Sequence, residues 1–307
     1  MAQTVSEQNM MNKIIKVCST AVVMFAFVFN TISVAAESQP SVATKVAVKV
    51  AASAQIDKAQ QAQQTLHQDW QYLVSQHVQP INQGHSSAVD YSAMQQDHAK
   101  LQGYLTQLSQ ITQTEFDAWD KSSQLALLIN AYNAWTVELI LTQYPDLDSI
   151  KDLGGLFSSP WDKSFIPLLG ETRSLNDIEH KLIRGSDRYN DPRIHFAVNC
   201  ASIGCPALRE EAYTGAKLEQ QLIAQTERFL SDSSRNYAKG NTLYLSSIFK
   251  WYGDDFTQDF AGADSVDAFL LLYPSALKLS PAQRAAAEKQ QLDIDFLDYD
   301  WSLNVAR

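Results

Sequence analysis

The sequence predicts a single compact α+β domain that is rich in helix and has a small, mostly antiparallel sheet. The 307 residues include only 11 Gly and 9 Pro, too few for a strand-and-turn sandwich of this length, so substantial helix is expected. Helical patterns dominate residues 57–144, whereas alternating apolar patterns characteristic of strands come later, at 193–199, 241–249 and 292–304. No internal repeat and no convincing linker divides the chain.

Residues 1–36 have the pattern of a secretory signal peptide. Lys13 and Lys16 form a short positive stretch, an unbroken apolar run follows at 21–29, and small residues come at 33–36. The apolar run is shorter than the ~20 helical residues that cross a bilayer, so we expect no stable membrane span after cleavage. The pattern predicts a periplasmic or secreted protein, and an uncleaved N-terminal anchor is the alternative.

The mature chain is predicted to begin with a mobile leader at 37–56, because these residues are small and weakly patterned. The main domain is predicted to span 57–304. It opens with an amphipathic helix over 57–78, since apolar residues there fall on one face. Turn-forming residues predict a loop at 80–87, and a second helix follows over 91–113.

Ser122 to Tyr144 is the most apolar segment after the signal, with serines at its start and Pro145 just beyond its end. Apolar residues surround its axis, which predicts a central buried helix. Asn130 and Asn133 lie one turn apart inside it. Buried amides need hydrogen-bond partners, so these two either clamp the backbone of a neighbouring loop or orient a catalytic group.

Glycines and prolines between 151 and 174 predict a surface loop wrapped over the core. Ser174 or Asn176 then caps a helix that runs to Arg184. This helix carries Glu179 and His180. Adjacent helical residues point about 100° apart, so we expect only one of the two to face a pocket.

The segment 193–199 alternates as a strand, with Ile194, Phe196 and Val198 on one face and Arg193, His195 and Asn199 on the other. Gly204 and Pro206 indicate a loop after it. Beyond this loop the patterns predict helices at 217–230 and 280–290, and strands at 241–249 and 292–304.

His195 with Cys200 and Cys205 is the strongest candidate for chemistry. A thiol becomes a nucleophile when a neighbouring imidazole takes its proton, and a third group usually orients that imidazole. A strand continuing through Cys200 would place its thiol on the face opposite His195. Either the strand ends near Asn199 and Cys200 turns back, or Cys205 approaches His195 instead.

Three other readings of the cysteines stay open. Cys200 and Cys205 could form a disulfide in an oxidising compartment or bind zinc with His195 and a fourth ligand such as His180, or Cys200 could pack in the core as a small hydrophobe. Asp255, which follows an aromatic pair, either orients His195 or caps a turn. No serine-nucleophile, phosphate-loop or zinc-helix motif is present, so we expect no cofactor and no metal. The net charge of −10 argues against a nucleic-acid partner.

Five ordered motifs resemble the family called domain of unknown function 547, over about residues 115–304: INAYNAWTV (129–137), SLNDIEHKLIR (174–184), DPRIHFAVNCASIGCPAL (191–208), FKWYGDDF (249–256) and YDWSLN (299–304). The resemblance implies an exported bacterial member of a family with no established activity, which also occurs in plants fused to a leucine-zipper segment. The block with His195 and the two cysteines has a distant similarity to papain-like and transglutaminase-like thiol enzymes.

Two functions therefore stand as hypotheses. The first is an exported thiol-dependent hydrolase or acyl transferase acting on a small-molecule or peptide substrate that the sequence does not identify. In it, Cys200 is the nucleophile and His195 the base. Asp255 or Glu179 is the orienting acid, and Cys205 is the alternative nucleophile. The second is a non-catalytic binding module braced by a Cys200–Cys205 disulfide, and a redox protein that cycles the same pair is a third possibility.

Overall fold

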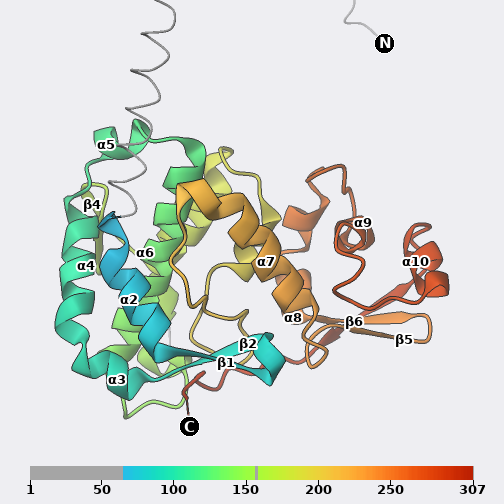
Figure 1. The fold of residues 1–307 in the computed structure, drawn as a ribbon, viewed down its shortest axis with the longest axis horizontal. Coiled ribbons are helices and arrows are strands. Elements are labelled where there is room, and N and C mark those ends of the chain that lie inside the picture. Colours follow the sequence, from blue (N-terminus) through green and yellow to red (C-terminus); the bar gives the residue numbers. More distant parts are fainter. Residues whose placement is uncertain (1–64, 156–157, 307) are drawn as a thin grey trace, which may run out of the picture. The chain divides into compact units, whose positions relative to one another are not determined.

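The structure is a computed structural model that describes residues 65–155 and 158–306 (Figure 1). The predicted signal peptide (1–36), the predicted leader (37–56) and the start of the first predicted helix lie outside these residues. Within them, helices predominate and the strands form three small sheets, which confirms the α+β class. Among the helices described, none is both long enough and apolar enough to cross a membrane.

The first helices of the described region lie on one side of a long central helix (Figure 1). They are α2 (Gln68–His77), α3 (Tyr91–Gln96), α4 (His98–Gln110) and α5 (Gln113–Asp117). The predicted helix over 91–113 is thus broken. At Asp97 the backbone leaves the helical region, with φ −94° and ψ 17°, and this residue ends α3 and starts α4.

The predicted loop at 80–87 is a hairpin in the structure. Strands β1 (Val78–Ile81) and β2 (Ser86–Val89) pair antiparallel, with Val78 opposite Val89. Asn82 and Gln83 take positive φ values of 48° and 57°, which lets the chain reverse tightly between the strands. The turn residues were recognised in the sequence, but the short strands beside them were not.

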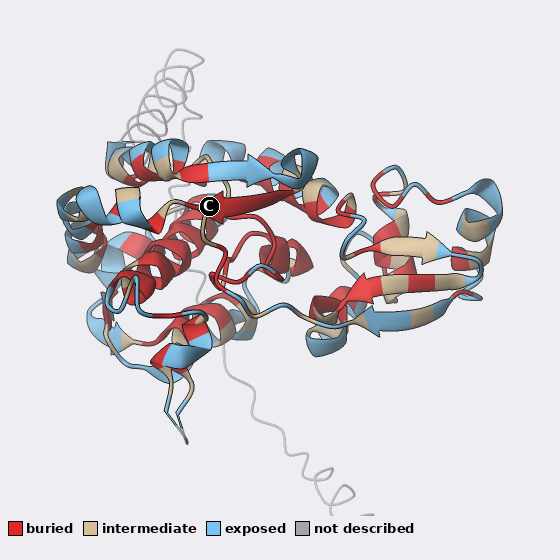
Figure 2. Cartoon of the chain, turned by 90° about the horizontal axis from the view of Figure 1, so that it is seen from below, coloured by how far each residue is buried: buried red, intermediate tan, exposed pale blue. Residues whose placement is uncertain are grey.

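Helix α6 (Lys121–Leu141) is the central buried helix that the sequence predicts. Asp120 caps it by accepting a hydrogen bond from the Ser123 backbone N–H. Almost every residue from Ser123 to Leu141 is buried, so the helix contacts protein on all sides (Figure 2). It supplies much of the first of two clusters of buried apolar residues.

The predicted surface loop at 151–174 contains regular structure. Strands β3 (Ile166–Leu168) and β4 (Glu171–Arg173) form a second antiparallel hairpin. Leu169 and Gly170 both have positive φ at its turn, the conformation that matches the twist of paired strands. The helix expected next is present, but residues 177–183 are wound as a π-helix. Such turns are rare and occur frequently at functional sites.

The strand predicted over 193–199 is wrong. Pro192 to Phe196 form a 3₁₀ helix, which Asp191 caps through the Arg193 backbone N–H. Proline at the first helical position favours this winding. All residues from 192 to 199 are buried, so the alternation in the sequence does not separate a core face from a solvent face.

The last part of the chain forms a second unit of packing. Helix α7 (Leu218–Leu230) confirms its prediction, and strands β5 (Tyr237–Lys239), β6 (Thr242–Ser246) and β7 (Asp293–Leu297) form a sheet in that order. Strands β5 and β6 are antiparallel, whereas β6 and β7 are parallel. The predicted strands at 241–249 and 292–304 are therefore shorter than expected. Helices α8 (Ser247–Trp251), α9 (Val266–Leu271) and α10 (Pro281–Ala287) pack with this sheet around the second apolar cluster.

The segment after β7 returns to the first helices. Leu303 donates its backbone N–H to Asp148, and Asn304 donates to Ala201. The Val89 N–H donates in turn to the Asn304 carbonyl. This return places the residues around 300 beside the loop that carries the two cysteines.

Candidate functional site

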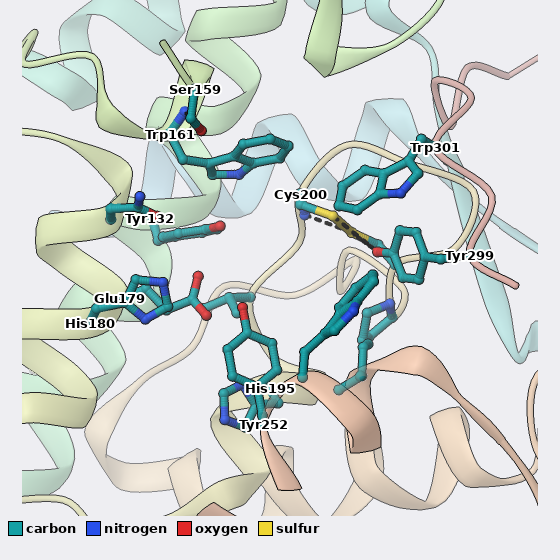
Figure 3. Close-up of a pocket in the computed structure, with 16 residues that line it drawn as sticks. Tyr132, Ser159, Trp161, Glu179, His180, His195, Cys200, Tyr252, Tyr299 and Trp301 are labelled. Atoms are coloured by element: carbon teal, nitrogen blue, oxygen red, sulfur yellow. Dashed lines mark hydrogen bonds between the residues drawn. A yellow bond between two sulfur atoms is a disulfide. The ribbon is translucent and has the colours of Figure 1, made fainter. Parts of the chain in front are cut away.

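A cavity of about 250 Å³ lies where the two apolar clusters meet (Figure 3). Its walls come from α6, the turn at 159–161, the π-helix, the 195–206 segment, α8 and the residues around 300. The sixteen lining residues are Tyr132, Ser159, Trp161, Asn176, Glu179, His180, His195, Val198, Cys200, Cys205, Pro206, Ile248, Trp251, Tyr252, Tyr299 and Trp301.

Five of the residues singled out in the sequence line this cavity: Glu179, His180, His195, Cys200 and Cys205. Asp255 does not line it but contacts His195 from behind. Glu179 and His180 both reach the cavity, contrary to the expectation that only one would. Both side chains come from the π-helix and line the cavity (Figure 3).

His195 is buried and held on two sides. Its Nε2 lies 2.7 Å from Oδ2 of Asp255, and its ring stacks on Tyr252 with centroids 4.0 Å apart. Burial lowers the pKa of His195, and the Asp255 contact offsets this only in part. The imidazole is therefore neutral near pH 7. Because an ionised carboxylate only accepts, the ring donates its Nε2–H, and Nδ1 is left as a buried acceptor without a partner among the described residues.

Asp255 is fixed by Arg184 as well as by His195. The Arg184 Nε and Nη2 atoms donate to its two oxygens at 2.6 and 3.0 Å, and Arg184 Nη1 lies 2.8 Å from Nδ1 of His180. Burial raises the pKa of Asp255, but the hydrogen bonds from His195 and Arg184 outweigh it and hold the pKa well below its usual value. The predicted orienting role of Asp255 therefore has a geometric basis.

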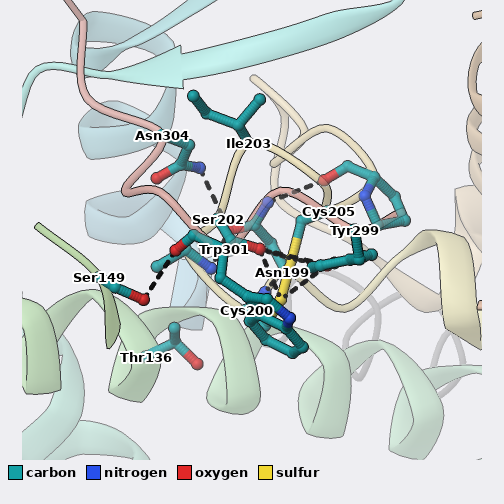
Figure 4. The surroundings of a disulfide bond; sticks show 12 residues. Thr136, Ser149, Asn199, Cys200, Ser202, Ile203, Cys205, Tyr299, Trp301 and Asn304 are labelled. Carbon is teal, nitrogen blue, oxygen red and sulfur yellow. Dashed lines mark hydrogen bonds between the residues drawn. A yellow bond between two sulfur atoms is a disulfide. The ribbon is translucent and has the colours of Figure 1, made fainter. Parts of the chain in front are cut away.

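Cys200 and Cys205 form a disulfide (Figure 4). The Cys200 backbone N–H donates to Sγ of Cys205, and the Tyr299 hydroxyl lies 3.1 Å from Sγ of Cys200. The zinc alternative finds no support, because both sulfurs are in the bridge and no three or more His, Cys, Asp or Glu side chains gather as a metal site in the described part of the chain.

The disulfide loop is tied to the segment around 300 by its backbone. Ile203 N–H donates to Ser302, and Gly204 N–H donates to Asp300. Arg235 adds hydrogen bonds to the carbonyls of Ile203 and Cys205. The bridge therefore belongs to a rigidly bonded wall of the cavity.

Glu179 is a buried carboxylate that faces two phenols. In Figure 3 its oxygens lie between the hydroxyls of Tyr132 and Tyr252. Burial raises the pKa of both phenols, and the charge of Glu179 and its hydrogen bonds raise it further. Both tyrosines are therefore protonated and able to donate to the carboxylate.

Asn130 and Asn133 clamp backbone, one of the two roles left open in the sequence. Asn130 exchanges two hydrogen bonds with the backbone of Tyr213, at 2.8 and 2.9 Å. Asn133 donates to the Ala197 carbonyl at 2.9 Å and accepts from the Asn199 N–H at 2.8 Å. Asn133 thus fixes the short segment between His195 and Cys200.

Sequence reasoning missed the aromatic wall of the cavity. Ring centroids of Trp251, Tyr299 and Trp301 lie 4.5 to 5.7 Å apart, and Trp161 contacts Trp301 at 5.7 Å. Three of these rings come from the motifs at 249–256 and 299–304. The concentration of aromatic residues in both motifs was a signal of a shared wall.

Residues 116–230 match the family described as "Protein of unknown function, DUF547". Three of the five motifs lie in this range, and the two that supply Asp255 and most of the aromatic wall lie beyond it. No curated protein and no solved structure matches the chain. Glu179, His195 and the disulfide therefore belong to a DUF547 segment, and the family indicated by the sequence motifs is confirmed over residues 116–230.

Proposed function

We propose that this protein is a small-molecule binding module whose Cys200–Cys205 disulfide braces the wall of the aromatic cavity. The observation that carries the proposal is that both sulfurs are joined and that the bridge itself lines the cavity. The thiolate is the nucleophilic form of cysteine, and a disulfide has none. The oxidised protein is thus equipped to bind a ligand and not to attack one.

The composition of the cavity supports a ligand site. Small-molecule pockets are concave and largely apolar, with a few convergent polar groups, and about 300 Å³ is the lower end of their usual size. The cavity of about 250 Å³ has aromatic walls and one buried carboxylate, Glu179. It therefore suits a ligand the size of a small metabolite.

We further propose that the protein is exported by the segment 1–36. Disulfides persist in oxidising compartments such as the periplasm and the extracellular medium. The Cys200–Cys205 bridge is consistent with such a compartment. Intact mass of the exported protein under non-reducing conditions, with and without iodoacetamide, tests both points, because it reads the cleavage site and the state of the two sulfurs together.

A fragment screen by ligand-observed NMR tests the binding function. Val198 lines the cavity, so Val198→Phe fills part of it, whereas Ile223→Phe makes the same kind of enlargement on the surface of α7. We expect fragments to bind the wild type and Ile223→Phe but not Val198→Phe. Fragments that bind all three proteins equally, or none of them, would refute the proposal.

Thiol-dependent hydrolysis or acyl transfer is the second candidate, for the reduced protein. One observation favours it: His195, Cys200 and Cys205 line the same cavity, with Asp255 behind His195. Reduction would free two thiols in the same cavity as a neutral imidazole whose Nδ1 has no partner in the described part of the chain. After reduction, chloroacetamide should modify one cysteine much faster than free cysteine, and His195→Gln should abolish the difference. Slow, equal labelling of both cysteines would eliminate this candidate.

A further inference from the structure

We infer that the ligand of this cavity carries an organic cation, an alkylated or quaternary ammonium group, bound between the Glu179 carboxylate and the aromatic wall. The inference rests on the proposed binding function and specifies its ligand. Tyr252, which also lines the cavity, extends the aromatic wall formed by Trp161, Trp251, Tyr299 and Trp301.

The described side chains that line the cavity include a carboxylate but no lysine or arginine. Among the described residues, Glu179 is the only carboxylate that lines the cavity, and no lysine or arginine lines it. Burial lowers the pKa of His195 from 6.5, so its imidazole adds no positive charge near pH 7. Within the same described part of the chain, Glu179 takes part in no ion pair, although 13 such pairs are formed elsewhere. A buried charge is costly without an opposite charge, and a cationic ligand would provide one.

The nearest arginines do not fill this role. Arg184 is close enough for Glu179 to affect its pKa, but its guanidinium is engaged by both oxygens of Asp255 and by His180. Arg235 pairs with Asp232 and donates to backbone carbonyls of the disulfide loop. The positive charges around the cavity are thus already matched, and the negative charge of Glu179 is not.

Two tyrosines hold the Glu179 carboxylate in place through hydrogen bonds. The hydroxyls of Tyr132 and Tyr252 both lie beside the Glu179 carboxylate and hydrogen-bond with it (Figure 3). Phenol hydroxyls donate hydrogen bonds but carry no positive charge. They therefore orient the Glu179 carboxylate without supplying an opposite charge.

The aromatic wall supplies the second half of the site. The face of an aromatic ring is the negative end of its quadrupole, and Trp is the strongest partner for a cation. The protein already uses one of these rings in this way, because Nζ of Lys151 lies 3.7 Å from the ring centroid of Trp301. Lys151 is exposed and does not line the cavity, so its ammonium group does not occupy the cavity.

The test compares choline with 3,3-dimethyl-1-butanol, its uncharged analogue of the same shape. Titration of the oxidised protein is followed by tryptophan fluorescence, because three tryptophans line the cavity. We expect choline to bind at least about tenfold more tightly than the neutral analogue. Glu179→Gln should lose this preference, while Asp254→Asn, which removes an exposed charge that does not line the cavity, should retain it.

Each result has a distinct meaning. Equal affinities for the two probes in the wild type would overturn the cationic ligand but leave the binding module in place, and this comparison does not depend on a variant folding. If other fragments bind but choline does not, the cationic ligand is likewise overturned and the binding module remains in place. If neither the probes nor any fragment binds, the proposed function itself fails. Loss of the preference in Asp254→Asn as well as Glu179→Gln would assign it to overall charge and overturn the role of Glu179.

Discussion

His195 and Asp255 lie sixty residues apart in the sequence, yet Nε2 of the imidazole is 2.7 Å from Oδ2 of the carboxylate. The contact joins the 3₁₀ helix at Pro192–Phe196 to the short helical turn after α8. Arg184, from the end of the π-helix, binds the same carboxylate. One aspartate thus connects two segments that line the cavity, the π-helix and the segment that begins at His195, to the turn after α8.

Replacing this aspartate should destabilise the protein. Asp255→Asn removes the charge that Arg184 and His195 both contact, so we expect a loss of about 2–3 kcal/mol in the free energy of unfolding, measured in urea at pH 7. The pKa of Asp255 is held below its unfolded value of 3.8. The stabilisation that ionised Asp255 gives the folded protein is therefore present above pH 3.8 and is lost as the pH falls further below that value. The variant should lack this part of the acid dependence, and the neighbouring Asp254→Asn should keep it.

His67 should make the fold sensitive to mild acid. Burial lowers its pKa from 6.5 to about 4. Between these values the unfolded chain binds a proton that the folded protein does not, so stability falls as the pH drops from 6.5 to 4, by about 3 kcal/mol from this residue. Urea unfolding across this range should show a smaller loss in His67→Gln.

Tyr104→Phe is the matched control for His67. The Tyr104 hydroxyl lies 2.8 Å from Nδ1 of His67, but burial and not this hydrogen bond lowers the pKa. The variant should therefore keep the loss between pH 6.5 and 4. An acid dependence that disappears in Tyr104→Phe would contradict this explanation.

The two asparagines of α6 should differ in their effect on the cavity. Asn130→Ala and Asn133→Ala each leave one buried N–H and one buried carbonyl unpaired, so each should cost about 2–4 kcal/mol of stability. Only Asn133 binds the segment between His195 and Cys200. Fragment affinity should therefore fall in Asn133→Ala and stay close to wild type in folded Asn130→Ala.

Gly204 should not tolerate a side chain. A Cβ atom there would lie 2.8 Å from the ring of Tyr299. Gly204→Ala should displace that ring, cost about 1–3 kcal/mol and weaken ligand binding. Gly103, inside α4, has no atom within 4 Å of the corresponding position. Gly103→Ala should stabilise the protein by about 0.5–1 kcal/mol, because alanine favours helix.

Reduction of the disulfide should lower the thermal midpoint. Closing the short loop between Cys200 and Cys205 restricts the unfolded chain, and on the loop-entropy account this is worth about 2–3 kcal/mol. Differential scanning calorimetry with and without a reductant measures the change. The double variant Cys200→Ala, Cys205→Ala should match the reduced protein and no longer respond to reductant.

Long helices with one strong pattern were predictable from the sequence. The sequence predicts the central helix at 122–144, and α6 spans 121–141. It is predictable because its apolar content and its flanking serines and proline are local signals. The segment 193–199 was not predictable in this way. It is buried on every side, so its alternation of apolar and polar residues has no relation to solvent.

The residues of the candidate site also differ in whether the sequence alone could indicate them. His195, Cys200, Cys205 and Glu179 belong to the same family segment, and their residue types suggested chemistry. The aromatic wall depends on contacts between distant segments. Trp251 and Trp301 stack with centroids 5.7 Å apart, although one follows β6 and the other follows β7. No periodicity within either segment could indicate that contact.

Tyr299 and Trp301 follow the other cavity residues in the chain, so the cavity can be completed only after these two residues have been synthesised. A ribosome makes the chain from its N-terminus, so the whole DUF547 segment at 116–230 is synthesised well before these two rings. Until they arrive, the disulfide loop has no partner for its Ile203 and Gly204 N–H groups, and one side of the cavity is open to water. A fragment limited to 116–230 would therefore carry the family signature and the acidic group without a ligand site.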